Sequence, residues 1–265
     1  AAELDGLPAD YVTARKPDAS GSITLTTHDV DMQVVSSYAS NVALRKRLMM
    51  ERWNVAVPAN VKVLERLLAI RHEIATLLGY STWAEYHAPP LMAGDAGTVA
   101  HFIDKVYNAS TPAATREYAE LLARKKQELP AATSLESWDR AYYAEQVRRA
   151  RYGFDSQSVR PYFPYERVRA GVMDVSSQLF GVTFRPAPSL PTWHPALESY
   201  EVLHRGELIG RLYLDVHPRA QKANSGASVA TLHRGARGIH VPEAVLTASV
   251  PGAVPGDPGL MTHDQ

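Results

Sequence analysis

The ten histidines of this chain are the side chains best suited to hold a catalytic metal ion, so their spacing decides which metal chemistry the sequence supports. A catalytic zinc helix needs two imidazoles four residues apart on one face, with a glutamate beside the first as general base. No two histidines in this sequence have that spacing. The nearest imitation begins at His72 and Glu73 and has Thr76 where the second ligand is needed. Because threonine is not a usual zinc ligand, we interpret this segment as a solvent-exposed helix face.

The other reactive groups are isolated along the sequence. Asp215 and Glu243 are single carboxylates without an evident partner. The sequence has no G-x-S-x-G elbow, no Walker loop and no G-x-G-x-x-G loop. Four histidines of the loop-rich C-terminal part would have to converge in space to bind a ligand, so ordinary surface positions are the simpler interpretation. These are His217, His233, His240 and His263.

A mainly helical scaffold must position these groups. Apolar residues recur at three- and four-residue steps, as in amphipathic helices. Asn60 is a candidate N-cap, Gly79, Gly153 and Gly181 are candidate left-handed stops, and Pro112 fits the first turn of a new helix. The predicted helices cover residues 29–53, 60–79, 81–88, 99–106, 112–128, 137–152 and 164–180.

Apolar stripes mark the faces that these helices should pack. The helix at 60–79 carries a stripe of Leu64, Leu67, Leu68, Ile74, Ala75 and Leu78. In the helix at 164–180 we expect a buried side made of Val168, Val172, Val175, Leu179 and Phe180.

The strand signals are few and lie mostly near the C-terminal end. Residues 199–203 and 208–214 flank a turn in which Gly206 supplies the positive φ of a tight hairpin. Val245, Leu246 and Val250 predict one more strand, and residues 22–26 are either an edge strand or extended chain. We therefore expect a mainly α fold with a small β element. All 265 residues form one partial domain in this reading, helical over 1–185 and hairpin- and loop-rich over 186–265.

Composition excludes several functional classes. The apolar fraction is 45% and the charged fraction 21%, as in globular domains, and 28 basic residues balance 28 acidic ones. Arg148 and Arg149 form a basic run with Arg151, but Glu145 and Asp155 bracket it, so we expect a solvated helix face and no nucleic-acid partner. No apolar run approaches the roughly 20 residues of a membrane span. The absence of cysteine rules out disulfides, and the compartment stays open between cytoplasm and periplasm.

Several segments, in the same order along the chain, resemble the thimet oligopeptidase family of zinc metallopeptidases. The best match is the strand and its sequel at 213–219 (YLDVHPR), and Leu260-Met-Thr-His resembles the tract that precedes the family's zinc helix. The resemblance rests on the set of segments, which follow one another in the family's order over most of the chain. The other segments are 4–8 (LDGLP), 41–45 (NVALR), 64–85, 92–102, 137–143 (SWDRAYY), 160–164 (RPYFP), 168–181, 193–195 (WHP) and 200–202 (YEV).

This resemblance implies an internal part of a longer, two-lobed, zincin-like peptidase that cleaves short peptides in a channel between helical lobes. Zinc would serve the parent enzyme, but we expect none bound by this chain, because H-E-x-x-H is absent from the sequence. We expect the chain alone to be inactive. There are departures: Ala220-Gln221-Lys222 stands where the family commonly has Glu-Gly-Lys, and Ser249-Val250 where it tends to have Asn-Phe.

The same resemblance gives candidate substrate-channel residues: Tyr213, Asp215, His217 and Arg219. The hairpin could offer an edge strand on which an extended peptide pairs through backbone hydrogen bonds. Two other hypotheses stay open. The chain is one part of a split peptidase whose zinc helix comes from a separate chain, or it is a non-catalytic helical module that binds peptides or proteins. If it is a fragment, an apolar surface should be exposed where the missing part docks.

Overall fold

The computed structural model describes residues 2–15, 17–219, 221–222, 227–252 and 259–262. Contacts divide the chain into two compact units. Unit 1 comprises Ala1–Leu48 and Ala144–Gln265, and unit 2 comprises Met49–Tyr143. The assignment of all residues to one partial domain stays a prediction. Among the described residues, no helix combines the length and the apolar character needed to cross a bilayer.

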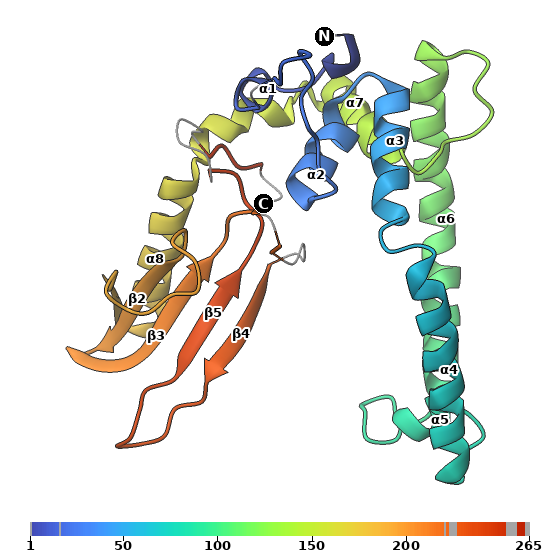
Figure 1. The fold of residues 1–265 in the computed structure, drawn as a ribbon. Helices are drawn as coiled ribbons and strands as arrows, with labels where there is room; N and C mark the ends of the chain where they lie inside the picture. Colours follow the sequence, from blue (N-terminus) through green and yellow to red (C-terminus); the bar gives the residue numbers. More distant parts are fainter. Residues whose placement is uncertain (1, 16, 220, 223–226, 253–258, 263–265) are drawn as a thin grey trace. The chain divides into compact units, whose positions relative to one another are not determined.

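The structure is helix-rich, as predicted, with 49% of the residues in helices, and the strands lie near the C-terminal end (Figure 1). Unit 1 holds η1 (Ala2–Leu4), α1 (Ala9–Thr13), α2 (Asp29–Tyr38), η2 (Ser156–Tyr162) and α8 (Tyr165–Phe180). Unit 2 holds α4 (Ala59–Leu77), α5 (Trp83–His87) and α6 (Ala96–Glu128). The unit boundaries fall inside α3 (Val42–Trp53) and α7 (Arg140–Tyr152).

The predicted helix at 29–53 is two helices, because the chain turns at Ala39 and Ser40. Ala39 has extended backbone angles, and the buried Arg45 guanidinium donates to the carbonyls of Ala39 and Ser40 at 2.7 and 3.1 Å. The Asn41 side chain then accepts from the amide of Leu44 at 3.0 Å, as an N-cap does. Apolar periodicity does not reveal this break, since it is made by polar side-chain bonds.

Two helix boundaries predicted in unit 2 are wrong. Asn60 is not the N-cap of α4, because its own amide already donates to the carbonyl of Ala56, and Pro58 holds the cap position. Pro112 does not begin a helix but lies inside α6. Proline removes one helical N–H. The hydroxyls of Ser110 and Thr111, just before it, donate to the carbonyl of Tyr107 at 3.2 and 2.7 Å.

A mixed five-stranded sheet forms the β part of unit 1, in the order β1-β2-β3-β5-β4. Its strands are β1 (Val182–Pro186), β2 (Glu198–His204), β3 (Glu207–Asp215), β4 (Ser228–His233) and β5 (Glu243–Thr247). Neighbouring strands are antiparallel except β3 and β5, which are parallel. The hairpin and the strand near Val245 are confirmed, whereas β1 and β4 were not predicted. Residues 22–26 are extended chain outside any strand.

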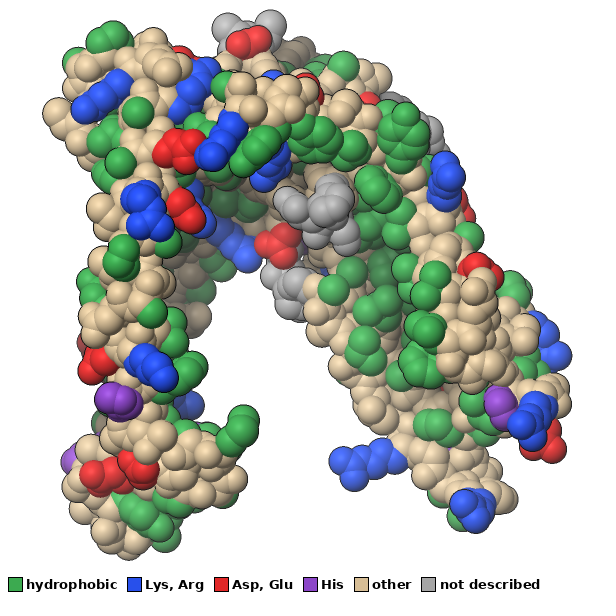
Figure 2. Space-filling model, turned by 180° about the vertical axis from the view of Figure 1, so that it is seen from behind, with side chains coloured by type: hydrophobic (Ala, Val, Ile, Leu, Met, Phe, Trp, Pro, Cys, Tyr) green, Lys and Arg blue, Asp and Glu red, His purple; other side chains and the backbone are tan. Residues whose placement is uncertain are grey.

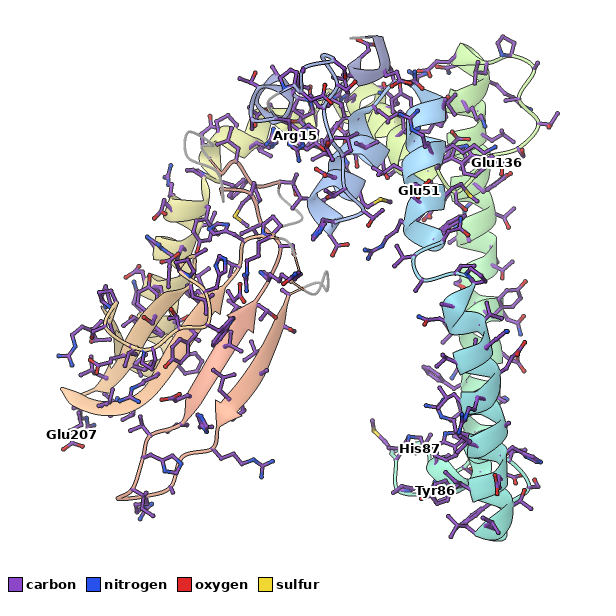
Figure 3. The ribbon with its side chains drawn as sticks, viewed as in Figure 1. Arg15, Glu51, Tyr86, His87, Glu136 and Glu207 are labelled. Atoms are coloured by element: carbon purple, nitrogen blue, oxygen red, sulfur yellow. The ribbon has the colours of Figure 1, made fainter. Side chains whose placement is uncertain are left out.

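The turn between β2 and β3 has the backbone that its glycine predicts. Arg205 and Gly206 both have positive φ, 51° and 85°, as the favoured two-residue hairpin turns require. His204 pairs with Glu207 across the turn, and Figure 3 labels Glu207 at the tip of the hairpin.

The sheet packs one face against α8, and this layer holds the largest described core. Tyr165 of α8 and Tyr200 of β2 cluster there with Leu214, Val216, Ala248 and Met261. Two smaller clusters of buried side chains lie among the short helices. One packs Val35 of α2 against Leu44 and Leu48 of α3, and the other packs Tyr38 of α2 against Tyr11 of α1. Gly181 ends α8 in the left-handed conformation, as predicted.

The buried side predicted for α8 is largely wrong. Only Val168 contacts the core, while Val172, Val175, Leu179 and Phe180 are exposed, the last two at 72% each. The helix instead turns Tyr165 and Met173 toward the sheet. Apolar spacing correctly identifies a helix with an apolar stripe, but it does not reveal how much of that stripe is buried.

Candidate functional site

The four predicted channel residues lie on the end of β3 and the segment that follows it. Tyr213 and Asp215 point to the same face of the sheet, because side chains alternate along a strand. Parallel pairing with β5 fixes both, since Tyr213 is opposite Val245 and Asp215 is opposite Thr247. This face lies opposite the α8 layer and is partly covered by the segment 187–197, through Leu190, Trp193 and Leu197.

Tyr213 is a packing residue of this second face. Only 3% of its surface is exposed, and it clusters with Leu197 and Val245. The indole of Trp193 lies 5.9 Å from its ring, and burial raises the pKa of the Tyr213 phenol. Tyr213 therefore has almost no surface of its own that is open to a ligand.

Asp215 is 5% exposed, accepts hydrogen bonds from two side chains and forms an ion pair with a third. Arg219 binds it with both terminal nitrogens, one at 2.8 Å, and Trp193 donates its indole N–H at 3.2 Å. The Lys222 ammonium lies 3.2 Å from the same carboxylate. The hydrogen bond from Arg219, aided by Lys222 and Trp193, holds the pKa of the Asp215 carboxyl well below its usual range. This carboxylate therefore forms ion pairs with the two neighbouring cations and is unsuited to act as a general base.

His217 and Arg219 are the two predicted residues that remain partly accessible. The His217 ring stands edge-on to Tyr165, with 4.6 Å between the ring centres, and its Nδ1 is 3.2 Å from the carbonyl of Val250. Arg219 lines an open pocket of about 430 Å³. The other lining residues are Arg15, labelled in Figure 3, with Thr26, His28, Val30, Asp31 and Pro218.

Sequence reasoning gave no site role to Lys222, which is central to this site. Its side chain is 8% exposed, and its ammonium donates to the carbonyls of Asp215, His217 and Ala248 at 2.7, 2.9 and 2.6 Å. A usable signal was present in the spacing. A carboxylate on the last residue of a strand is followed by cations four and seven residues later, Arg219 and Lys222.

The hairpin does not provide the open sheet edge that was expected of it. β2 lies between β1 and β3, and β3 lies between β2 and β5, so neighbouring strands already pair with both hairpin strands. The edges are β1 and β4. All six residues of β4 are exposed, and β4 was not predicted because it lies in a segment rich in small residues.

The described histidines do not gather into a metal site. No group of three or more His, Cys, Asp and Glu side chains that could hold a metal ion occurs among the described residues. His240 meets the carbonyl of Arg234 at 2.8 Å, and His233 lies on β4. In α4 the hydroxyl of Thr76 donates to the carbonyl of His72. His263 lies outside the described residues.

The basic run of α7 is neutralised as its sequence context predicts. Arg148 and Arg149 both bind Glu145, at 3.0 and 3.2 Å, and Arg149 also binds Asp155 at 3.0 Å. Ser156 donates its hydroxyl to the same buried glutamate at 2.8 Å. These groups join the end of α7 to η2.

Large apolar side chains are exposed in both units (Figure 2). In α4 the predicted stripe is open over most of its length, and Leu77 is 78% exposed. Only Ala75 of that helix is buried. At the tip of unit 2, Tyr86 stacks edge-on against Tyr80 and Trp83, and His87 lies flat on Trp83 (Figure 3). Exposed apolar side chains therefore occur in both units, and their role as a docking surface of a fragment stays a prediction.

Comparison with known proteins gives a consistent family. The profile described as peptidase family M3 matches residues 35–265. Oligopeptidase A of Escherichia coli is 31% identical over all of this chain, which covers 41% of that protein. Thimet-like oligopeptidase of Dictyostelium discoideum and saccharolysin of Saccharomyces cerevisiae are each 26% identical over 99% of the chain, which covers 42% and 40% of them.

The chain therefore spans about two fifths of the length of the curated relatives that it matches. The resemblance of the sequence to the thimet oligopeptidase family is confirmed over nearly the whole length of the chain. Zinc is typical of that family. On this match and these relatives, the chain belongs to peptidase family M3.

Proposed function

We propose that this chain is a section of a zinc metallo-oligopeptidase that hydrolyses short peptides, and that it supplies part of the wall of the substrate channel. Membership of peptidase family M3 is the observation that carries the proposal. Short peptides are the substrate class that fits relatives named oligopeptidases. The larger assembly would be a two-lobed, zincin-like enzyme.

Within this wall, β4 is the element suited to bind an extended peptide. An edge strand has unpaired N–H and C=O groups along one side, and a peptide can add to it as a further strand. β4 is the exposed edge next to β5, and β5 pairs with the strand that ends at Asp215. His217 and Arg219 would contact side chains or a terminus of the peptide, while Tyr213 and Asp215 support them from the sheet.

Zinc would be held by residues that this sequence does not contain. The described residues hold no suitable ligand group, so no catalytic step is assigned to them. In a complete peptidase, zinc would polarise the scissile carbonyl and activate a water molecule. This chain alone would bind peptides without hydrolysing them.

The exposed apolar residues of unit 2 support a role for a further protein segment. Leu64, Leu68 and Leu77 of α4 and Phe102 and Ile103 of α6 are exposed, although such residues normally lie in a core. The segment that covers them would belong to the same polypeptide or, in a split peptidase, to a separate chain that also carries the zinc helix. The alternative of a non-catalytic binding module rests on the same surfaces and differs only in the absence of catalysis.

Two assays test these proposals. A quenched peptide of eight to twelve residues should not be hydrolysed by this chain, with or without added zinc. Hydrolysis that a chelator abolishes and zinc restores would overturn the prediction of inactivity. Binding of a fluorescein-labelled, uncleaved peptide is then measured by fluorescence anisotropy.

Proline substitutions test the role of the β4 edge. Neighbouring residues of an antiparallel strand direct their N–H groups to opposite sides. Of Ala230→Pro and Thr231→Pro, one therefore loses an outward N–H and the other loses a bond to β5. The variant that keeps its stability should bind the peptide about tenfold more weakly, which is the loss of about one hydrogen bond. Thr183→Pro in β1, the opposite edge, is the control and should leave peptide affinity unchanged. Equal loss in both edges would argue against β4.

A further inference from the structure

The carboxyl ends of the two parallel strands meet at a single ammonium group. β3 ends at Asp215 and β5 ends at Thr247, and these two residues are paired. Beyond them, the amides of Ala248 and Val250 donate to the carbonyls of Asp215 and Val216 at 3.0 and 2.9 Å. The Lys222 ammonium lies against the same strand ends and joins residues of both.

The Lys222 contacts have the composition of a site for a monovalent cation. Three main-chain carbonyls, those of Asp215, His217 and Ala248, lie 2.6–2.9 Å from Nζ. An ammonium has three N–H donors, so these bonds use all of them. The Asp215 carboxylate, 3.2 Å away, supplies the opposite charge. Converging main-chain carbonyls are also how proteins replace the hydration shell of a monovalent cation.

The same contacts fix the segment that carries His217 and Arg219. Lys222 holds the carbonyl of His217 directly, and it shares the Asp215 carboxylate with Arg219. Without the ammonium, three part-buried carbonyls would lose a donor, and among the described residues only that of Asp215 would keep another, the amide of Ala248. The position of both side chains therefore depends on a residue that lies beyond them in the sequence.

We propose that Lys222 is a positioning residue whose ammonium acts as a tethered cation: it joins the carboxyl ends of β3 and β5 and holds His217 and Arg219 in place. The effect on peptide binding rests on the proposed function. The structural role of the cation does not, so the two can be tested separately.

Chemical rescue in the full-length chain tests this role. Lys222→Ala removes the three outer carbons and the nitrogen, which is the shape of n-propylammonium. Hydrogen exchange at Ala248 and Val250 should rise about tenfold in this variant, as local opening becomes easier. Tens of millimolar n-propylammonium should restore slow exchange, whereas n-propanol and tetramethylammonium should not. Lys125→Ala, which removes a buried lysine of unit 2, is the matched control and should show no change at these amides.

Lys222→Met keeps the test decisive if Lys222→Ala fails to fold. Methionine preserves the apolar stem and removes the charge, so exchange at Ala248 and Val250 should still rise. Wild-type exchange in Lys222→Met, or equal rescue by n-propanol, would overturn the proposal, because packing alone would then explain the site. Peptide affinity should fall in Lys222→Ala and return with n-propylammonium. If the wild-type chain binds no peptide, the proposed function fails while the exchange result still decides the role of Lys222.

Discussion

The two units of this chain use similar apolar sequence in different ways. Every described core cluster lies in unit 1, where the sheet, α8 and the short helices cover one another. Unit 2 has equally apolar helices, yet its only buried apolar residues among those described are Ala75, Ala88, Tyr142 and Tyr143. Since both sequences show helical periodicity, amphipathic pattern alone does not distinguish a helix whose apolar stripe is buried within its own unit from one whose stripe is exposed.

The units also differ in what their buried charges do. Asp215 in unit 1 gathers two cations and an indole next to the proposed binding segment. The fully buried Asp139 in unit 2 binds Lys125 at 2.5 Å and the amide of Glu136 at 3.2 Å, which joins α6 to the turn before α7. Unit 1 therefore buries apolar and charged side chains among its own elements, whereas unit 2 leaves most of its large apolar side chains exposed.

The largest expected difference comes from truncating one apolar residue in each unit. Tyr213→Ala should destabilise unit 1 by about 4 kcal/mol, because a buried aromatic ring leaves a cavity beside Val245 and Leu197. Leu77→Ala in α4 should change stability by less than about 0.5 kcal/mol, because that side chain is exposed and alanine favours helix. Pulse proteolysis in urea measures both. A large loss in Leu77→Ala would show that this face of unit 2 is covered in solution.

Removing the charge of Asp215 should have the next largest effect. Asp215→Asn leaves Arg219 and Lys222 without their counter-charge, and breaking a partly buried ion pair costs about 3 kcal/mol. Because the pKa of this carboxyl is lowered in the folded chain, its stabilisation is complete above the unfolded pKa of about 4 and is lost as pH falls toward the folded value.

Urea denaturation between pH 6 and pH 3 measures this effect. The wild-type chain should lose stability over the acid side of that range more steeply than Asp215→Asn. Asp18→Asn is a useful control, because Asp18 also has a lowered pKa but lies exposed in the N-terminal segment, where it binds Ser20. Identical acid profiles in wild type and Asp215→Asn would contradict the ion-pair network.

Hydrogen exchange compares the units without any substitution. Amides of β3 and β5 should exchange about a hundredfold more slowly than those of α4, because a segment with few buried apolar contacts opens locally at low free energy. Mass spectrometry of peptides from residues 207–215 and 59–77 measures the difference. Equal protection would mean that the helices of unit 2 do not need a partner.

The sequence predicts local elements well where one residue controls them. Gly206 and Gly181 have the positive φ that their positions indicate, and the hairpin and the end of α8 follow. It predicts poorly where distant groups decide. Pro112 lies inside α6 although it has no N–H for the carbonyl four residues earlier, and β4 is a strand because β5 is there to pair with it.

The candidate site shows the same limit. Family resemblance draws attention to the end of β3, where Asp215 and Arg219 form an ion pair. It does not reveal that Tyr213 is buried or that the hairpin has no free edge, because both follow from strand order. Lys222 was overlooked for a related reason. Its three partners are main-chain carbonyls, and a carbonyl carries no residue identity for a motif to record.

The smallest expected effect concerns the open stripe of α8, which is the part of unit 1 that most resembles unit 2. Val175→Gln with Leu179→Gln should alter stability by less than about 0.5 kcal/mol, since both side chains are exposed. Val168, about two turns before Val175 on the same stripe, contacts the core. Val168→Gln should cost about 2 kcal/mol, because it places an amide against apolar side chains. Urea denaturation measures both, and sedimentation velocity should show less self-association in the double variant, because exposed apolar patches favour association. If the double variant lost as much stability as Val168→Gln, the stripe would be covered in solution. The exposed part of α8 would then no longer resemble the exposed helices of unit 2.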